Sequence, residues 1–352
     1  MSGRKIKILV TGAGSLLGQG LLRSLSLSNM EKEIFTADPS AKSAGHWLGD
    51  KAQIIPMANH PDYLPSIKKI IKEHDIDVVL VGTDVELPLL AEHKQSILEQ
   101  YDCKVIVSPP KVIKIANDKF LTATFLEEHG FPFPASVLAN NKDELKVFSS
   151  KHAFPLFAKP RDGARSKGIK KILNERELLD LPNSPNNLVV QQYLANDEQE
   201  YTSGCLVVNG KCKSVVTMRR DLRDGNTYRA YRDEESSKYD KTLIKIAEAL
   251  GAEGPVNFQF RIQNDEPVVF EINGRYSGTT PIRAMYGFNE VEALLMHHFF
   301  DEPVVQAPLR KGTLLRTWSD VMIDNEQVSA LQNNGSLSEP ACVFGNYLLG
   351  SK

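Results

Sequence analysis

The chain has 352 residues, of which 41% are hydrophobic and 24% are charged, enough for a core divided among two or three domains. Its 42 Lys and Arg residues nearly balance its 44 Asp and Glu residues, so the basic excess of a nucleic-acid-binding protein is missing. No stretch approaches a membrane span, and the first residues lack an apolar signal core. The four cysteines lack metal-type spacing and suit a reducing compartment. We therefore expect a cytoplasmic protein that binds neither nucleic acid nor membrane.

The first hundred residues alternate between strand and helix patterns. Strands are predicted near 6–10, 33–37, 53–56, 77–82 and 104–107, with helices near 16–27, 62–74 and 85–99. This alternation predicts a parallel, doubly wound, Rossmann-like α/β domain over residues 1–110.

A glycine-rich turn follows the first strand and contains Gly12, Gly14 and Gly18. Asp38 ends the next strand. Such a turn can aim a helix N-terminus at a pyrophosphate, with the acidic residue on a ribose hydroxyl, which would make it an NAD(P) site. The alternative is a close strand-to-helix crossing that needs small residues and binds nothing. A third interpretation places Gly12 and Asp38 beside an acceptor substrate.

Two further domains are predicted after this one. Pro109-Pro110 and the loop 181–187 mark the boundaries, which gives a small α+β lid over 111–187 and a central and C-terminal part over 188–352. In the last part, strands near 188–193, 200–208, 212–219, 255–262 and 267–273 predict an antiparallel sheet, with helices near 235–250 and 288–300. We expect the charged segment 219–240 to be a mobile surface loop, and residues 306–352 to supply either a dimer contact or a C-terminal strand.

Polar side chains alternate along a predicted hairpin over residues 257–275. Gln259 lies on one face of the first strand, and Glu271 and Asn273 share a face of the second. Carboxylate and amide oxygens suit magnesium held against substrate phosphates, and Arg275 can neutralise charge on a transferring phosphoryl group. An ordinary polar hairpin face is the alternative.

A second polar segment lies upstream, where an apolar strand ends in Lys159 and a glycine-bounded loop follows. Gly163 and Gly168 would let backbone amides turn toward an anion, and Ser166 would add a hydroxyl. The Gly-Lys-Ser/Thr ending of a Walker loop is missing. The alternative is a flexible basic surface turn.

Two more segments complete a pattern. Asn117-Asp118-Lys119-Phe120 begins a helix that ends at Gly130, before Phe131-Pro132-Phe133-Pro134, and a strand from Val189 to Leu194 leads into Glu198-Gln199-Glu200-Tyr201-Thr202. In this order the four segments resemble the ATP-grasp superfamily. The Gln and Glu-x-Asn set looks most like the carbamoyl-phosphate-synthase large-chain branch.

The resemblance implies an ATP-grasp fold and an ATP-dependent carboxylate-amine ligase. Such an enzyme would form an amide or peptide bond through an acyl phosphate, using ATP and Mg²⁺, with Mn²⁺ as an alternative metal. Its partners would be a small-molecule carboxylate and an amine, and a homodimer is possible. The sequence does not identify the two substrates, and bicarbonate with ammonia stays among the candidates.

The resemblance also implies roles for individual residues. Lys119 and Lys159 would contact the phosphates, under a loop running from Asp162 to Gly168. Glu200, preferred to Glu198 because it fits a Glu-Tyr-Thr ending, would bind the ribose hydroxyls. The adenine would be held by Gln191, Gln192, Tyr193 and Leu194. The implied metal ligands are Gln259, Glu271 and Asn273, and the implied catalytic residues are Lys159, Arg275 and Arg220.

Some of these assignments have alternatives. Arg220 would touch the phosphate or acyl phosphate, unless it belongs to a solvated basic turn, and Arg283 or Arg275 would recognise the carboxylate substrate. Gly274 stands where family members carry proline, which would loosen the backbone before Arg275. The hinge has Gln191-Gln192 where a carboxylate is common. The remaining function classes are an NAD(P)-dependent oxidoreductase and a non-catalytic nucleotide-binding protein.

Overall fold

The computed structural model describes residues 4–162, 168–182, 187–195, 199–317 and 319–345. By backbone contacts the chain forms two compact units. Unit 1 combines Met1–Val107, Tyr276–Val304 and Leu315–Lys352, and unit 2 combines Ser108–Arg275 and Val305–Leu314. The predicted domain limits of 110 and 187 stay predictions. The chain leaves unit 1 after Val107 and re-enters it at Tyr276.

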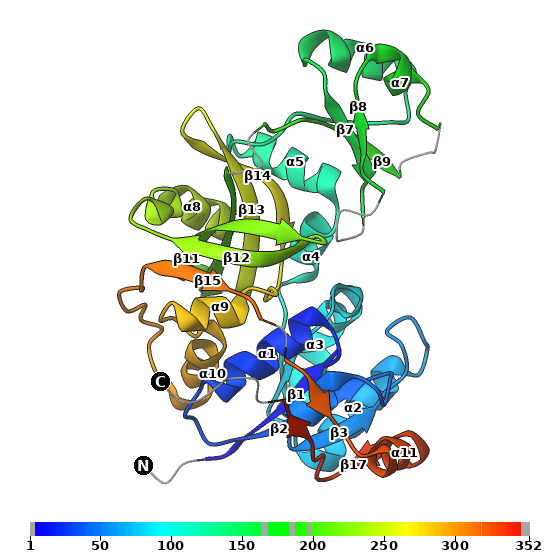
Figure 1. Ribbon diagram of the computed structural model, residues 1–352, viewed down its shortest axis with the longest axis vertical. Coiled ribbons are helices and arrows are strands. Elements are labelled where there is room, and N and C mark those ends of the chain that lie inside the picture. The colour runs from blue at the N-terminus through cyan, green and yellow to red at the C-terminus, as the bar shows by residue number, and fades with distance from the viewer. Residues whose placement is uncertain (1–3, 163–167, 183–186, 196–198, 318, 346–352) are drawn as a thin grey trace. The chain divides into compact units, whose positions relative to one another are not determined.

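Unit 1 is built on a six-stranded sheet in the order β17-β3-β2-β1-β4-β5 (Figure 1). The strands are β1 (Ile6–Thr11), β2 (Lys32–Asp38), β3 (Lys51–Ile54), β4 (Val78–Leu80), β5 (Lys104–Ile106) and β17 (Ser336–Leu337). The first five strands pair in parallel, and β17 joins the edge of β3 in the opposite direction. The consecutive residues Ile8, Leu9 and Val10 are all fully buried, as expected for a parallel strand covered on both faces. The predicted α/β domain and the C-terminal strand are both confirmed.

Helices follow the strands of unit 1, and two short strands complete it. The helices are α1 (Leu16–Ser26), α2 (Tyr63–His74), α3 (Leu87–Tyr101), α9 (Thr280–Met285), α10 (Glu290–Phe300) and α11 (Asn325–Asn334), with 3₁₀ turns η1 (Ala44–Leu48) and η2 (Asp84–Glu86). Strands β16 (Val321–Met322) and β18 (Val343–Phe344) pair with each other. Leu331 of α11 packs with Trp47 in a small separate core, which attaches the C-terminal segment to this unit.

The larger sheet of unit 2 has the order β14-β13-β10-β11-β12-β15. Its strands are β10 (Glu200–Val208), β11 (Lys211–Arg223), β12 (Asn226–Arg232), β13 (Gly254–Gln263), β14 (Glu266–Asn273) and β15 (Gly312–Leu315). Helix α8 (Asp240–Leu250) follows the 3₁₀ turn η4 (Glu235–Ser237) and packs Leu243 and Ile246 against Phe258 and Phe260. Helices α4 (Pro110–Ala116) and α5 (Lys119–Glu128) join the same core. The predicted antiparallel sheet is confirmed for the strands from residue 200 onward. The strand predicted near 188–193 belongs to a second, smaller sheet instead, and the helix predicted near 288–300 belongs to unit 1, because strand pairing and helix packing are set by contacts in space and not by closeness in sequence.

The predicted surface loop over 219–240 is wrong. Strand β11 continues to Arg223 and turns back into β12 through Asp224 and Gly225, both of which have positive φ. Charge density in this segment suggested exposure, but alternation in a strand sends only every second side chain outward. Arg220 is accordingly 8% exposed.

A smaller antiparallel sheet, in the order β6-β9-β7-β8, forms the other part of unit 2 (Figure 1). It contains β6 (Ser136–Leu138), β7 (Leu156–Pro160), β8 (Lys170–Ile172) and β9 (Leu188–Gln192), with helices α6 (Lys142–Lys151) and α7 (Glu175–Leu179). Its own core includes Leu156, Ala158 and Val190. The small α+β element expected between the two main sheets is therefore present.

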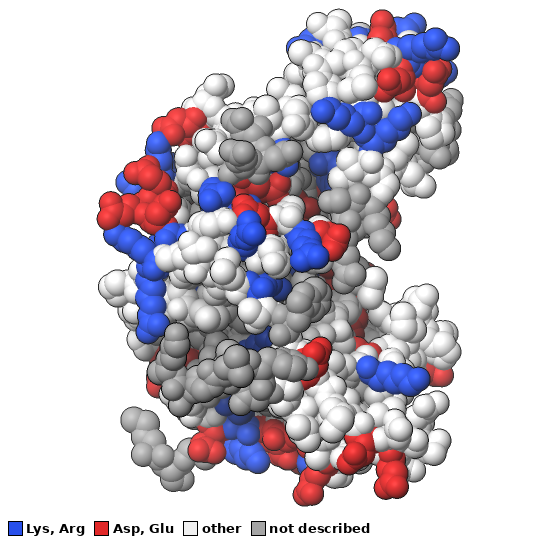
Figure 2. Space-filling model, in the orientation of Figure 1, with Lys and Arg blue, Asp and Glu red and all other residues white. Residues whose placement is uncertain are grey.

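The charges of the surface are mixed. On the face drawn in Figure 2, Lys and Arg side chains are interspersed with Asp and Glu. No helix in the described part of the chain is both long and apolar enough to cross a bilayer.

Candidate functional site

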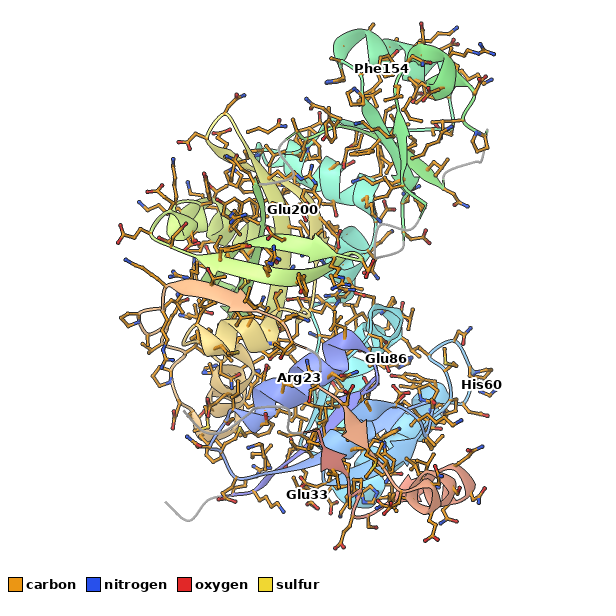
Figure 3. The ribbon with its side chains drawn as sticks, in the orientation of Figure 1. Arg23, Glu33, His60, Glu86, Phe154 and Glu200 are labelled. Carbon is orange, nitrogen blue, oxygen red and sulfur yellow. The ribbon has the colours of Figure 1, made fainter. Side chains whose placement is uncertain are left out.

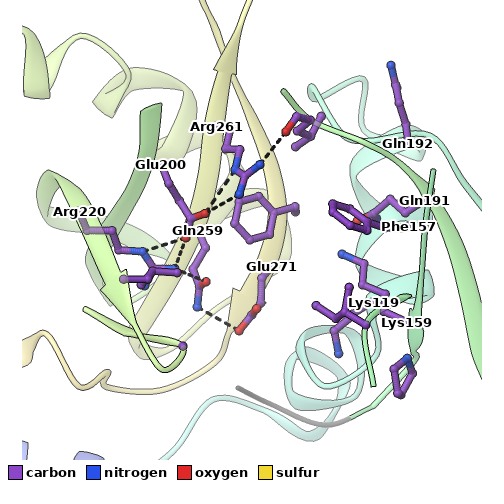
Figure 4. A pocket seen from close by; sticks show the side chains of 16 residues that line it. Lys119, Phe157, Lys159, Gln191, Gln192, Glu200, Arg220, Gln259, Arg261 and Glu271 are labelled. Carbon is purple, nitrogen blue, oxygen red and sulfur yellow. Dashed lines mark hydrogen bonds and ion pairs between the residues drawn. The ribbon is translucent and has the colours of Figure 1, made fainter. Parts of the chain in front are cut away.

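A cavity of about 210 Å³ in unit 2 brings most of the predicted nucleotide residues together (Figure 4). Its walls come from the small sheet, the large sheet and the start of α5. The predicted residues that line it are Lys119, Lys159, Gln191, Gln192, Leu194, Glu200, Arg220, Gln259 and Glu271. Residues separated by up to 152 positions in sequence thus line one cavity.

Strands β13 and β14 place the three predicted metal ligands side by side. Gln259 pairs with Glu271, and Asn257 with Asn273. The amide nitrogens of Gln259 and Asn273 donate to the same atom, Glu271 Oε1, at 3.0 and 3.1 Å. The Asn273 oxygen accepts from Arg275 at 3.1 Å. One carboxylate oxygen is therefore the point at which two side-chain amides converge.

A β-bulge explains a residue that the sequence prediction missed. The pairing register of β13 with β14 shifts between Gln259 and Phe260, which leaves Phe270 without a partner. Because a bulge breaks strict alternation, the consecutive residues Phe270 and Glu271 can both face the cavity. Phe270 supplies an apolar surface beside the Glu271 carboxylate.

Lys159 is a buried cation. Strand β7 sends Leu156 and Ala158 into the small core and the alternate residues Phe157 and Lys159 to the cavity. Lys159 is 8% exposed, and its ammonium makes no hydrogen bond to any residue that the structure describes. Burial lowers the pKa of Lys159 to about 8, although Glu271 acts in the opposite direction.

Lys119 enters the cavity from the first turn of α5. Asp118 caps this helix by accepting from the backbone N–H groups of Phe120 and Leu121, and it also binds Arg161 at 2.5 Å. The Lys119 backbone N–H donates to the Arg161 carbonyl at 3.0 Å. These bonds tie the start of α5 to the end of β7, so the two lysines enter one cavity. Burial lowers the pKa of Lys119, opposed by Glu271.

Glu200, at the start of β10, is bound by two arginines (Figure 4). Arg220 donates to Oε1 through Nε at 3.2 Å and Nη2 at 2.7 Å. Arg261 donates to Oε2 through Nε at 3.3 Å and Nη2 at 2.9 Å. Arg261 was not among the predicted site residues, although its position two residues after Gln259 on β13 places it on the same face by alternation.

The hinge segment is only partly available to a ligand. β9 is paired on both edges, and Gln192 donates its backbone N–H to the Ala135 carbonyl. The Gln191 amide donates to Ser136 Oγ at 2.9 Å, and the Leu194 carbonyl accepts from Arg261 at 2.6 Å. Tyr193 packs edge-on against Phe157 and does not line the cavity.

Some predicted residues cannot be placed at this site. Gly163, Ser166 and Glu198 lie outside the described residues. Gly168 is described and has a φ of +75°, which favours glycine. Asn273 and Arg275 adjoin the cavity through Glu271 without lining it.

The absence of a side chain at Gly274 lets helix α4 pack closely against the backbone there. A Cβ atom at this position would lie 3.0 Å from Ile113 Cδ1 of α4. The residue is buried, so the loosening of the backbone expected before Arg275 is replaced by close contact with a helix.

The glycine-rich turn of unit 1 is filled by the protein itself. A Cβ on Gly14 would lie 2.3 Å from Ser43 Oγ, and one on Gly18 would lie 2.3 Å from the Gly12 carbonyl oxygen. Asp38 accepts from the backbone N–H groups of Gly14 and Ser40 and from the Ser43 hydroxyl. Of the three interpretations of this turn, these contacts favour the close strand-to-helix crossing.

A buried carboxylate, Glu86 (labelled in Figure 3), lies next to the same turn, where a Cβ on Gly12 would be 3.3 Å from its Oε2. It is 3% exposed and accepts hydrogen bonds from the side chains of Thr11, Tyr63 and Thr83 at 2.7 to 3.0 Å. Burial raises the pKa of Glu86. These bonds join β1, α2 and η2, so the cluster stabilises the turn.

The suggestion that Arg283 recognises a carboxylate substrate is wrong. Arg283 and Glu290 are each 1% exposed and form an ion pair. The remaining guanidinium N–H groups donate to Ser277, Thr279 and Thr280. All the donors of Arg283 are therefore used inside unit 1.

Two parts of the chain match known families. Residues 184–320 match the family described as "ATP-grasp in the biosynthetic pathway with Ter operon", and residues 8–106 match the "PylC-like, N-terminal domain". The arginine-specific carbamoyl phosphate synthase large chain of Neurospora crassa is 24% identical over 78% of this chain and 26% of its own length. The large chain from Lachnoclostridium phytofermentans is 24% identical, over 79% and 27%. The chain spans about a quarter of these curated relatives.

Solved structures share the fold. N5-carboxyaminoimidazole synthetase from Staphylococcus aureus, complexed with ADP, has a TM-score of 0.66 at 16% identity, covering 95% of this chain and 87% of that one. The biotin carboxylase domain of Hydrogenobacter thermophilus 2-oxoglutarate carboxylase has a TM-score of 0.69 at 16%, covering 88% and 74%. An L-amino acid ligase from Bacillus licheniformis has a TM-score of 0.63 at 17%, covering 84% and 74%.

Proposed function

This chain belongs to the ATP-grasp superfamily, and on that premise we propose that it is a ligase that joins a carboxylate to an amine at the expense of ATP. The observation that carries the proposal is the meeting of Lys119 and Lys159 with Gln259 and Glu271 in one cavity. The two ammonium groups would bind the phosphates of a nucleotide, and the carboxylate opposite them would bind its metal ion.

The charges of the cavity suit a polyphosphate. Four cations line it, Lys119, Lys159, Arg220 and Arg261, against the two carboxylates of Glu200 and Glu271. Glu200 is already bound by the two arginines. The lysines are left to face Glu271 in a buried site, where an added anion gains most from their charge.

The donor set also fits a magnesium ion. Glu271 carries one free carboxylate charge, and Gln259 and Asn273 carry amide oxygens within reach of it. Mg²⁺ prefers oxygen ligands and completes its shell with phosphates and water, so one carboxylate suffices. We propose that Glu271, Gln259 and Asn273 hold this ion, or Mn²⁺. The ion would neutralise charge on the phosphates, and the amides would turn their oxygens toward it.

The residues of the chain would act by positioning and charge. Lys119 and Lys159 would hold the phosphates in line with the acceptor, and Arg275 would neutralise the transferring group. A carboxylate oxygen would bond to the γ-phosphorus as the bond to ADP breaks. The amine nitrogen would then bond to the acyl carbon, phosphate would leave, and the amine would lose a proton. Phe157, Phe270 and Leu194 would exclude water from the acyl phosphate.

The substrates and assembly remain part of the proposal. A bicarbonate anion is named with the Hydrogenobacter protein, and that protein is a dimer. For this chain we propose a small carboxylate and an amine as substrates, and a homodimer as the assembly.

Release of ADP with pools of carboxylates and amines tests the proposal. Hydroxylamine should trap the acyl phosphate as a hydroxamate with a carboxylate alone. Lys159→Met should abolish both signals, while Lys171→Met, on the neighbouring strand β8 and outside the cavity lining, should retain them. ATP binding without ADP release or hydroxamate over a broad set of acids would instead support a non-catalytic nucleotide-binding protein.

A further inference from the structure

The Glu200 carboxylate has no acceptor capacity left. A carboxylate offers about four lone-pair positions. Arg220 directs Nε and Nη2 to Oε1, and Arg261 directs Nε and Nη2 to Oε2. Its side chain is 7% exposed, which also keeps water from competing. Ribose hydroxyls therefore cannot bind Glu200 unless one arginine gives way.

The two arginines are held differently. The remaining nitrogen of Arg261, Nη1, donates a hydrogen bond to the Leu194 carbonyl at 2.6 Å. Leu194 and Glu200 stand at the two ends of the link between β9 and β10. One guanidinium thus connects the hinge that would hold the base with the carboxylate that would hold the ribose, as Figure 4 shows.

Arg220 instead binds groups that a nucleotide would need. Its Nη2 donates to Gln259 Oε1 at 2.5 Å as well as to Glu200, and Nη1 lies 3.4 Å from Thr227 Oγ1. The Gln259 oxygen is the atom that a cation would require. Arg220 lies in β11, opposite the lysines across the cavity, and a phosphate there would offer it charged acceptors in exchange for Glu200 (Figure 4).

We propose that Arg261 is a positioning residue that keeps Glu200 and the Leu194 carbonyl in place, whereas Arg220 leaves Glu200 and Gln259 when a nucleotide binds and turns to its phosphates. This division of roles rests on the proposed ATP site. It makes Arg261 a determinant of ribose recognition and Arg220 a determinant of phosphate recognition. Release of Arg220 frees acceptor positions on Glu200 for the hydroxyls.

Two affinity ratios measured by calorimetry separate the roles. The hydroxyl ratio compares ATP with 2′,3′-dideoxy-ATP, and the phosphate ratio compares ATP with adenosine, each with magnesium present. Arg261→Met should reduce the hydroxyl ratio about tenfold, the range of one hydrogen bond to a charged group, and leave the phosphate ratio unchanged. Arg220→Met should reduce the phosphate ratio by about tenfold and leave the hydroxyl ratio unchanged or larger.

Conservative variants protect the test against loss of folding. Arg261→Lys keeps the charge and one donor, and it should recover part of the hydroxyl ratio, with the thermal transition confirming a folded protein. The division of roles is overturned if both arginine variants change the same ratio, or if neither ratio changes. If the wild type binds no ATP, the proposed function fails together with this inference. If the wild type binds ATP but the two variants do not each change a different ratio, this inference alone is overturned.

Discussion

Gln259 and Glu271 face each other across β13 and β14, with the Gln259 amide donating to Glu271 Oε1 at 3.0 Å. The pair sits just before the bulge at which the register shifts. Backbone pairing therefore fixes the separation of the two side chains, and a metal bound between them needs only side-chain rotation.

Replacement of Gln259 tests this pair. Gln259→Leu should weaken the magnesium-dependent part of ATP binding by about tenfold, the lower end for losing an interaction that supports a metal site. Gln259→Glu adds a carboxylate and should preserve or strengthen it. Titration of magnesium at fixed ATP measures both, and equal magnesium affinity in all three proteins would contradict the assignment.

The affinity for ATP should fall at alkaline pH. The pKa of Lys159 is lowered to about 8 in the free protein, so its ammonium is charged below that pH and loses its proton above it. The dissociation constant of ATP should rise above about pH 8, by at most about tenfold per pH unit for a single group. Lys159→Arg keeps its charge and should flatten the profile. A wild-type profile as flat as that of the variant would contradict this role for Lys159.

Stability should depend on Asp240 in the acid range. Burial raises the pKa of Asp240 to about 6, although Thr217 donates to it at 2.6 Å. A raised carboxyl pKa means that the folded state holds the proton more tightly than the unfolded state. Its contribution to stability is therefore complete below about pH 4 and is lost as the pH rises through about 6.

Asp240→Asn provides the matched comparison. The free energy of unfolding of the wild type, measured with urea, should carry a component that falls between about pH 4 and about pH 6, and the variant should lack it. Parallel curves for the two proteins would contradict the assignment.

Two glycines of α1 separate packing from helix propensity. Gly18→Ala places a Cβ 2.3 Å from the Gly12 carbonyl oxygen and should destabilise the protein by about 1–3 kcal/mol. Gly20→Ala places a Cβ no nearer than 3.4 Å to its closest neighbour, Pro281 Cδ, which is ordinary contact, and should be neutral or stabilising by up to ~1 kcal/mol. Urea midpoints of the two variants measure the difference. Equal effects would mean that the turn can relax and that close approach is not its reason for glycine.

The sequence predicted the parts of the site that depend on local pattern. Alternation placed Gln259, Glu271 and Asn273 together, and Asp118 marked the start of the helix that carries Lys119. The same alternation would have included Arg261 had it been followed two residues further. Phe270 could not be predicted, because the bulge that turns it toward the cavity depends on how two strands pair.

Tertiary burial accounts for the errors. The sequence left a solvated turn open as the alternative for Arg220 and a substrate-facing role open for Arg283, since arginine is mostly exposed. Each instead finds a buried glutamate, Glu200 at a distance of 20 residues and Glu290 at seven. A partner on another element is not visible in local composition, so the segment 219–240 looked like a loop when it is a hairpin.

Binding of ATP in the presence and absence of magnesium, followed by calorimetry with NADPH titrated in parallel, tests the central claim most directly. We predict that the wild type binds ATP with an affinity that magnesium strengthens, that Glu271→Ala loses the magnesium effect, and that Lys159→Ala loses most of the affinity. NADPH binding without ATP binding would contradict the account and would place the ligand site at the Gly12 turn of unit 1.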